Sequence, residues 1–315
     1  MRPDLHEEAA EGDEQTMMSG MYAAVSGLEV NQTMLNVTAN NLSNVNTVGY
    51  KSASVDFADS LTQVLRGAAG AEASTAGNNP VQVGLGVQVA ATVNEMDEGS
   101  FQPTNNPLDV AIEGEGFLRV GTGTPTVEGP YTQGLPAALE YTRAGDLATD
   151  SNGFLTTQTG QYVIGFNAVA TKTAEGTTYA PGKEESYLRI PPGSADVSIG
   201  PDGAVTYVDE NPASETYGQR VTAGYISLAH FPNQTGLERL GNSLWGVTAN
   251  SGKPIVGLPG ENGLGSTIGG ELEMSNVNLA GEMTSMITAE RGFQANSRVI
   301  TVADEMLQSA VTMVS

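Results

Sequence analysis

Apolar residues at helical spacing mark both ends of the chain. The N-terminal set steps by three and four residues and comprises Met18, Met21, Val25, Leu28, Gln32, Leu35, Ala39 and Leu42. The C-terminal set follows the same spacing and comprises Leu279, Met283, Met286, Phe293, Ile300, Leu307, Val311 and Val314. Both sets predict amphipathic helices with an apolar seam of period about 3.5 residues. Two such ends are expected to pack together, which points to assembly rather than catalysis.

The long middle of the chain has a strand pattern instead. Short segments that alternate apolar and polar residues include 81–83, 110–112 and 117–120, and turn sequences at 150–153 and 201–203 predict hairpins. Many short strands separated by glycine turns favour an antiparallel sandwich or barrel-like body. The predicted fold class is therefore α+β, with the two terminal helices paired in a coiled-coil-like inner domain and an antiparallel β-rich body inserted between them.

The same patterns divide the chain into five parts. Residues 54–65 are expected to be helical or irregular, and Asn278 is expected to cap the last helix. The acidic first residues lack apolar periodicity and are expected to be disordered, with Met17 or Met18 as the true start. The predicted parts are the acidic extension 1–16, the N-terminal helical part 17–60, a flexible connector 61–80, the β-rich body 81–270 and the C-terminal helix 271–315.

Composition excludes several functional classes. The formal net charge of −23 disfavours binding to nucleic acid or to an anionic membrane surface. The absence of cysteine excludes disulfides, thiolate catalysis and cysteine-ligated zinc. No apolar run reaches the roughly 18 residues of a membrane span, and the N-terminus has no signal-peptide pattern. We therefore expect neither membrane insertion nor a cleaved leader.

Residues that could carry chemistry are scarce. His6 lies in the acidic extension, and His230 is expected to be a surface or half-buried residue near a strand end. The neighbouring carboxylates Asp109, Glu113 and Glu115 are interpreted as solvated turn residues. The sequence therefore predicts no catalytic residue, no metal site and no cofactor.

Four polar residues interrupt the apolar seams: Gln32, Glu290, Ser297 and Asp304. They either lie at the edge of a broad apolar stripe or fix the register of the helices against their neighbours. The sequence leaves both interpretations open.

Several separated motifs, in order, resemble those of the bacterial flagellar rod and hook proteins. The motifs are 21–28 (MYAAVSGL), 36–51 (NVTANNLSNVNTVGYK), 109–117 (DVAIEGEGF), 141–145 (YTRAG) and 275–280 (SNVNLA). The resemblance covers nearly the whole chain from Met18 onward. The family-motif residues are Asn40, Asn41, Asn44, Asn46, Thr47, Gly49, Tyr50, Lys51, Asn276 and Asn278.

The resemblance implies a structural subunit of a helical tube. Its partners would be copies of itself, other axial proteins such as the distal rod and the hook–filament junction, a hook cap and the flagellar export apparatus. Its place would be the hook or basal body, reached by export without a cleaved signal peptide. The subunit-assembly seam would consist of Met21, Val25, Leu28, Leu35, Leu42, Leu279, Met283, Met286, Phe293, Ile300, Leu307 and Val311.

Within this family the segment 79–87 most resembles the hook protein, and we expect a hook subunit from it. The distal rod protein is the alternative, because few residues separate Phe166 from the hairpin near Val197 and leave no room for a large outer domain. A secreted β-rich binding or adhesive module is the weaker alternative, although such a module would not need helical seams at both ends.

Overall fold

The structure, a computed structural model, describes residues 4–314 except for 69, 71–75, 124, 126–135, 137, 174–175, 213 and 215. The chain forms two units, which are described separately. The first contains Met1–Ser43, Ala53–Asn94 and Asn278–Ser315, and the second contains Asn44–Ser52 and Glu95–Val277.

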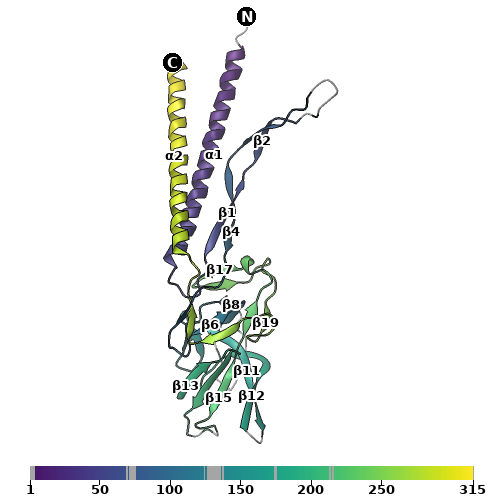
Figure 1. The fold of residues 1–315 in the computed structure, drawn as a ribbon, viewed down its shortest axis with the longest axis vertical. Helices are drawn as coiled ribbons and strands as arrows, with labels where there is room; N and C mark the ends of the chain where they lie inside the picture. The colour runs from purple at the N-terminus through teal and green to yellow at the C-terminus, as the bar shows by residue number, and fades with distance from the viewer. Residues whose placement is uncertain are drawn as a thin grey trace. The chain divides into compact units, whose positions relative to one another are not determined.

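The first unit is built on two long helices. Helix α1 spans Asp4–Ser43 and helix α2 spans Leu279–Val314, and they pack side by side in opposite directions (Figure 1). Asn278 caps α2, because its side-chain oxygen accepts hydrogen bonds from the backbone N–H groups of Ala280 (3.1 Å) and Gly281 (3.2 Å). Both predicted helices and the predicted cap are confirmed. The acidic segment differs from the expectation of disorder, since residues 4–16 have helical backbone continuous with α1.

A two-stranded ribbon completes the first unit. Strands β1 (Ala53–Asp59) and β4 (Val87–Asn94) pair, and the ribbon continues as β2 (Thr62–Arg66) paired with β3 (Val81–Gly84). The prediction of a helical or irregular 54–65 is wrong: β-branched and aromatic residues favour strands here, and β4 and β3 supply the partners of β1 and β2. The connector expected at 61–80 contains β2, while its residues 69 and 71–75 lie outside the described residues.

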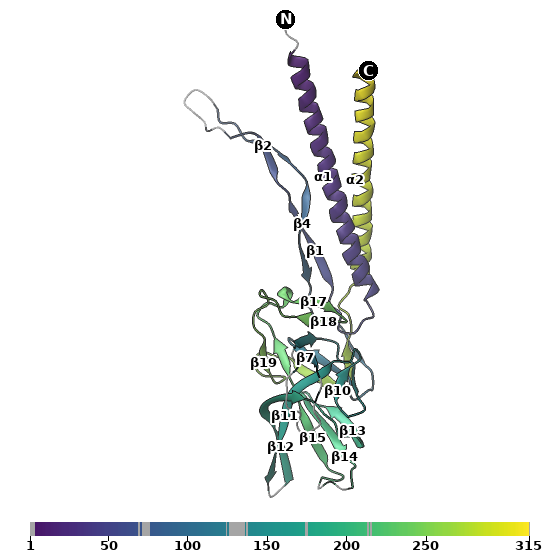
Figure 2. The ribbon, with the colours of Figure 1, turned by 180° about the vertical axis from the view of Figure 1, so that it is seen from behind.

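Figure 2 shows the ribbon from behind together with the helix pair of the same unit. The ribbon is joined to α1 by Ser26, whose hydroxyl accepts a hydrogen bond from the Val87 amide at 3.2 Å. Gly86 has a φ of 126°, and its Cα lies against Ser26, so no side chain fits there. Residues 81–94, assigned to the body from the sequence, thus pack with the helices instead.

The second unit is an antiparallel β structure. Its largest sheet runs in the order β13-β14-β15-β11-β7-β8-β18-β17, with β9, β10, β12, β16 and β19 paired at its sides, and β5 pairs with β21 and β6 with β20. The strands are β5 (Phe101–Pro103), β6 (Val110–Glu113), β7 (Phe117–Thr122), β8 (Ala138–Thr142), β9 (Leu147–Thr149), β10 (Leu155–Thr157), β11 (Tyr162–Thr173), β12 (Gly176–Tyr187), β13 (Ser194–Ile199), β14 (Ala204–Asp209), β15 (Arg220–Ile226), β16 (Leu228–His230), β17 (Glu238–Gly241), β18 (Leu244–Gly246), β19 (Ile255–Gly257), β20 (Ser266–Gly269) and β21 (Glu271–Glu273). A single-turn 3₁₀ helix, η1, spans Gln234–Gly236.

The predicted hairpins and fold class are confirmed. Asp150 closes the β9–β10 turn, because its side chain accepts hydrogen bonds from the amides of Asn152 (2.9 Å) and Phe154 (2.7 Å). Gly203, with a φ of 76°, lies in the β13–β14 turn. Paired terminal helices and an antiparallel β body make the chain an α+β protein. No helix in the described part of the chain is both long and apolar enough to cross a membrane.

The core of the second unit is aliphatic, with an aromatic cluster beside it. Leu118, Ile226 and Leu228 are fully buried in the aliphatic cluster. Phe117, Tyr141, Phe231 and Trp245 form the aromatic one, with edge-to-face ring contacts such as Tyr141–Phe231 at 4.8 Å. The chain has one tryptophan, so fluorescence of the buried Trp245 reports on the folding of this unit.

Prediction: Leu228→Ala should lower the free energy of unfolding of the second unit by about 2–5 kcal/mol, because the lost contacts leave a cavity. Leu240→Ala, the same change at a side chain that is 50% exposed, should cost less than about 1 kcal/mol. Urea denaturation followed by Trp245 fluorescence measures both. Equal costs would contradict the assigned core.

Candidate functional site

Small residues form the contact between α1 and α2. Gly27 of α1 lies against the side chain of Asn296, and Gly292 of α2 lies against that of Asn31. Ala289 and Ala303 of α2 are also buried. Small side chains allow the two backbones to approach closely, so this contact uses little of the apolar surface that the helices carry.

The seam residues predicted from the sequence are at most partly covered within the single chain. Within the chain itself they are exposed or half-buried, and none is fully buried. The exposed members, at 38–69% exposure, are Val25, Leu279, Met283, Phe293 and Val311. The half-buried members are Met21, Leu28, Leu35, Leu42, Met286, Ile300 and Leu307. Other large apolar side chains on the helices are exposed as well, namely Met18, Tyr22, Ile287, Val299, Val302 and Met306. The helix pair thus presents a large apolar surface to solvent.

Part of this surface is hollowed. A groove of about 510 Å³ opens between the middle of α1 and the C-terminal half of α2 and is lined by Gly20, Met21, Arg298, Val299, Val302, Ala303 and Met306. No side chain lies within 4 Å of a Cβ built at Gly20, so the close contact made at Gly27 is not repeated here.

The polar residues on the predicted seams are all exposed. This is true of Gln32, Glu290, Ser297 and Asp304. Glu290 and Asp304 accept hydrogen bonds from residues of their own helix, Gln294 at 3.2 Å and Gln308 at 3.0 Å. Both interpretations stay open, because a register contact with a neighbouring subunit would also leave these residues exposed in the single chain.

Asn41 connects three segments of the first unit. Its amide donates to the Ala53 carbonyl (2.8 Å) and to Glu282 Oε1 (2.9 Å), and its carbonyl accepts from the Ala53 amide (3.0 Å). The side chain is 1% exposed. One motif asparagine thus fastens the end of α1 both to β1 and to the first turn of α2.

A buried cluster of charges lies in the second unit. The carboxylate of Glu273 is fully buried between two cations, with Lys51 Nζ at 2.6 Å and Arg143 Nη1 at 3.2 Å. It also accepts a hydrogen bond from the Gly99 amide at 3.0 Å. Lys51 in addition donates to the Asp97 carbonyl at 2.7 Å. We call Lys51, Arg143 and Glu273 the charge node.

The charge node joins segments distant in sequence. Arg143 donates to the Gly114 carbonyl at 2.7 Å, and its guanidinium lies 5.4 Å from the centre of the Phe117 ring. Burial lowers the pKa of Lys51 below its ordinary value, and the nearby carboxylate of Glu273 opposes this shift. Since a buried ion pair contributes little unless its polar groups are satisfied, these additional hydrogen bonds favour the node, although Arg143 Nε is buried without a hydrogen-bond partner.

The other residues of the motif around Lys51 hold its backbone in place. Gly49 has a φ of 64°, its amide donates to the Glu273 carbonyl at 2.8 Å, and its Cα packs against the backbone of Ala144. The guanidinium of Arg239 lies 4.9 Å from the ring centre of Tyr50 and 5.0 Å from that of Trp245, and donates to the Lys51 carbonyl. A side chain at position 49 would be strained and would also clash.

Asn276 forms hydrogen bonds with the backbone segments that flank the charge node. Its side-chain carbonyl accepts from the Ser52 amide (2.7 Å), and its amide donates to the carbonyls of Glu95 (3.0 Å) and Asp97 (3.1 Å). Asn44 and Thr47 form a turn through a 3.1 Å side-chain hydrogen bond. Asn40 and Asn46 are exposed in the single chain. Most of the family motif is therefore structural.

Sequence reasoning missed Glu273, the centre of the charge node. The residue stands in an alternating strand, Glu271–Glu273, where an acid is normally expected to face solvent. The signal that could have found it is the lysine in the motif 36–51, because a lysine buried beside an arginine requires a carboxylate.

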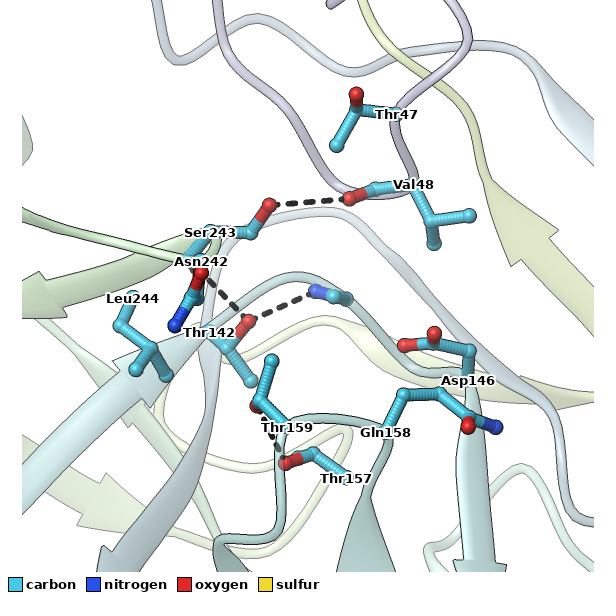
Figure 3. A pocket seen from close by; sticks show the side chains of 11 residues that line it. Thr47, Val48, Thr142, Asp146, Thr157, Gln158, Thr159, Asn242, Ser243 and Leu244 are labelled. Atoms are coloured by element: carbon cyan, nitrogen blue, oxygen red, sulfur yellow. Dashed lines mark hydrogen bonds between the residues drawn. The ribbon is translucent and has the colours of Figure 1, made fainter.

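The second unit also contains a pocket of about 220 Å³ (Figure 3). Its hydroxyl groups hold the surrounding turns: Ser243 donates to the Val48 carbonyl (3.4 Å) and Thr142 to the Ser243 carbonyl (2.9 Å). Among the residues lining it, Asp146 alone has an acidic or basic side chain, and burial raises the pKa of this carboxyl. The pocket lining contains no histidine, lysine or cysteine to pair with it, and the Thr142 and Ser243 hydroxyls are engaged by the backbone.

Other residues considered for chemistry have structural surroundings. His230 is 22% exposed, and its Nδ1 lies 3.1 Å from Glu115 Oε2 at a strand end. His6 lies in the part of α1 whose side chains are not described. In the described part of the chain, no three histidine or acidic side chains gather at metal-binding distances.

A chain that contains a helix pair with an exposed apolar surface and an antiparallel β body, without a catalytic constellation among its described residues, has the features of a structural subunit. Three family models match the chain. The model for flagella basal body rod proteins matches residues 21–51, that for the D1 domain of flagellar hook proteins FlgE/F/G matches 111–207, and that for the C-terminal part of flagellar basal body rod FlgEFG proteins matches 268–313.

Whole-chain relatives agree with these matches. The flagellar basal-body rod protein FlgG of Bacillus subtilis is 36% identical over 94% of this chain and 99% of its own length, and that of Caulobacter vibrioides is 34% identical over 93% and 98%. The flagellar hook protein FlgE of Borreliella burgdorferi is 26% identical over 94% and 100%. A crystal structure of the Helicobacter pylori hook protein FlgE2 covers 32% of this chain and 26% of its own at 22% identity, with a TM-score of 0.20 too low to bear on the fold.

The chain belongs to the flagellar rod and hook protein family. Members of this family are non-enzymatic structural subunits of the flagellum, serving motility, and they polymerise with other axial proteins of the basal body and hook.

Prediction: Glu273→Gln should lower the free energy of unfolding of the second unit by about 3–5 kcal/mol, because it leaves two buried cations without a counter-charge. Lys51→Met should cost about half as much, since Glu273 keeps its pairing with Arg143. Urea titrations followed by Trp245 fluorescence compare them. A cost for Lys51→Met that matches or exceeds that of Glu273→Gln would contradict the central role of Glu273.

Proposed function

We propose that the chain is a distal rod subunit of the flagellar basal body. Supporting this is its collinearity with the rod proteins FlgG, which are 32–36% identical over 97–99% of their own lengths. The alignment with the hook protein extends over 443 residues although this chain has 315, so that hook protein contains long insertions that this chain lacks. The similarity to rod proteins outweighs the hook-like segment 79–87 on which our expectation of a hook subunit rested.

The exposed apolar residues of the helix pair support assembly through this pair. Burial of one large apolar side chain contributes roughly 1.5–3 kcal/mol, so burying several of them against neighbouring subunits would be a strong driving force. The seam predicted from the sequence supplies such residues on both helices, for example Val25 on α1 and Met283 on α2. A heterologous contact that does not close on itself produces a helical filament. The helix pairs of successive subunits would then form the inner wall of a tube.

The negative net charge of the chain opposes this assembly. With a formal net charge of −23, free subunits repel one another, and apolar burial must offset this repulsion. We infer further that the subunit leaves the cell through the flagellar export apparatus without a cleaved signal peptide. At the growing tip it would join copies of itself and neighbouring axial proteins beneath a cap.

Prediction: Met283→Asp should prevent polymerisation and leave the second unit folded, because the residue is 53% exposed in the single chain and carries the proposed contact. Thr288→Asp is the matched control, adding the same charge to α2 at an exposed polar position. Electron microscopy of negatively stained samples scores tubes, and Trp245 fluorescence checks folding. Normal tubes from Met283→Asp would argue against the seam.

Prediction: cells lacking this protein should yield basal bodies whose rod is truncated and which carry no hook. Electron microscopy of purified basal bodies distinguishes the two placements, since loss of a hook subunit would leave a complete rod. A complete rod that lacks only the hook would overturn the distal rod assignment, and re-expression of the protein should restore the missing part.

A further inference from the structure

Each terminal helix contains a glycine followed four residues later by an asparagine. In α1 these are Gly27 and Asn31, and in α2 they are Gly292 and Asn296. The helices run antiparallel, and the two motifs meet: Gly27 faces Asn296, and Gly292 faces Asn31. Because glycine has no side chain, each glycine leaves room for the asparagine of the other helix. We call these four residues the Gly–Asn pair.

The fit at the Gly–Asn pair is tight in both directions. A Cβ at Gly292 would lie 2.6 Å from Asn31 Oδ1, and one at Gly27 would overlap the amide group of Asn296. Asn31 Nδ2 also donates a hydrogen bond to the Gly27 carbonyl at 2.6 Å, which fixes the orientation of its side chain. A glycine inside a helix costs about 1 kcal/mol relative to alanine, so two such glycines at the contact require a compensating packing role.

The register set by this contact extends to the end of α1. Four residues along α1, from Gly27 to Asn31, correspond to four residues back along α2, from Asn296 to Gly292. Ten more residues along α1 reach Asn41, and ten more back along α2 reach Glu282, which is the residue that Asn41 bonds at 2.9 Å. One register therefore holds over about 21 Å of helix.

A slip of one helical turn would destroy this fit. In one direction Asn296 would face Asn31, so two amide side chains would compete for one space. In the other direction Gly27 would face Gly292 and leave a void. Leucine and methionine contacts tolerate such slips better, because flexible apolar side chains repack.

We propose that the Gly–Asn pair selects α2 as the partner of α1 and fixes the register between them. Register decides which apolar residues of the two helices lie level on the surface presented to a neighbouring subunit. That consequence rests on the proposed function, whereas the register itself does not.

The test uses disulfide trapping, since the chain has no cysteine of its own. Thr38→Cys with Ser285→Cys reports the observed register, because both positions lie at the same level of the helix pair. Met34→Cys with Ser285→Cys reports a slip of one turn, in the direction that brings position 27 to Gly292. Each pair is oxidised with diamide in the dilute full-length chain or in tubes, whichever state is helical by circular dichroism, and crosslinks within one chain are separated by size.

In the parent chain the 38/285 crosslink should form about tenfold faster than the 34/285 crosslink. Gly27→Asn should abolish or reverse this preference, because an asparagine at 27 clashes with Asn296 and fits against Gly292. Adding Asn296→Gly should restore the preference, because the asparagine at position 27 then faces a glycine at position 296. Gly20→Asn is the matched control and should behave as the parent, because nothing lies within 4 Å of a Cβ at that position.

Two results would overturn the proposal: Gly27→Asn keeping the parent preference, or the exchanged pair failing to regain both helicity and preference. Failure of the distal rod assignment would leave the crosslinking pattern unchanged, because the pattern is measured within single chains.

Discussion

The second unit depends on a carboxylate that is fully removed from water. Glu273 is 0% exposed and lies between Lys51 and Arg143, so three charged side chains are committed to one position. Lys51 comes from the segment that follows α1, and Glu273 from the last strand before α2. The interaction therefore brings together, inside one unit, the two places where the chain leaves and approaches its terminal helices. Because isolated buried charges are so unfavourable, loss of Glu273 would leave both cations without a counter-charge, whereas loss of Lys51 would still leave the pair of Glu273 and Arg143.

In the helix pair, different residues form the contact within the chain and the exposed apolar surface. Small residues such as Gly27 and Ala289 make the contact within the chain, while larger ones such as Met283 and Phe293 stay exposed. A coiled coil with leucine at its centre would consume that apolar surface internally. By pairing through glycine, alanine and asparagine, the helices keep their larger apolar residues for other contacts.

The sequence predicted the terminal helices, the cap at Asn278 and the hairpins at 150–153 and 201–203, because each depends on local spacing or turn chemistry. It misplaced strands β1 and β4, whose pairing is not local and whose neighbour is α1. It also identified Lys51 and Asn276 by motif alone, and gave no sign of Glu273, since burial of an acid depends on partners distant in the chain. The period of the apolar residues gave no sign of the contact between the helices, which lies one position earlier, at Asn31 and Asn296 rather than Gln32 and Ser297, because small and polar residues carry no hydrophobic signal.

The α1 and α2 residues of the Gly–Asn pair belong to one polypeptide. A helix of another subunit would therefore have to displace a partner from the same chain. Tethering holds the two helices of one subunit near each other at an effective concentration set by the chain that joins them. A helix from another subunit, at the far lower concentration of free protein, would be a poor rival for the same contact. Exchange of terminal helices between subunits is thereby disfavoured, so that each subunit would enter an assembly with its own helices paired.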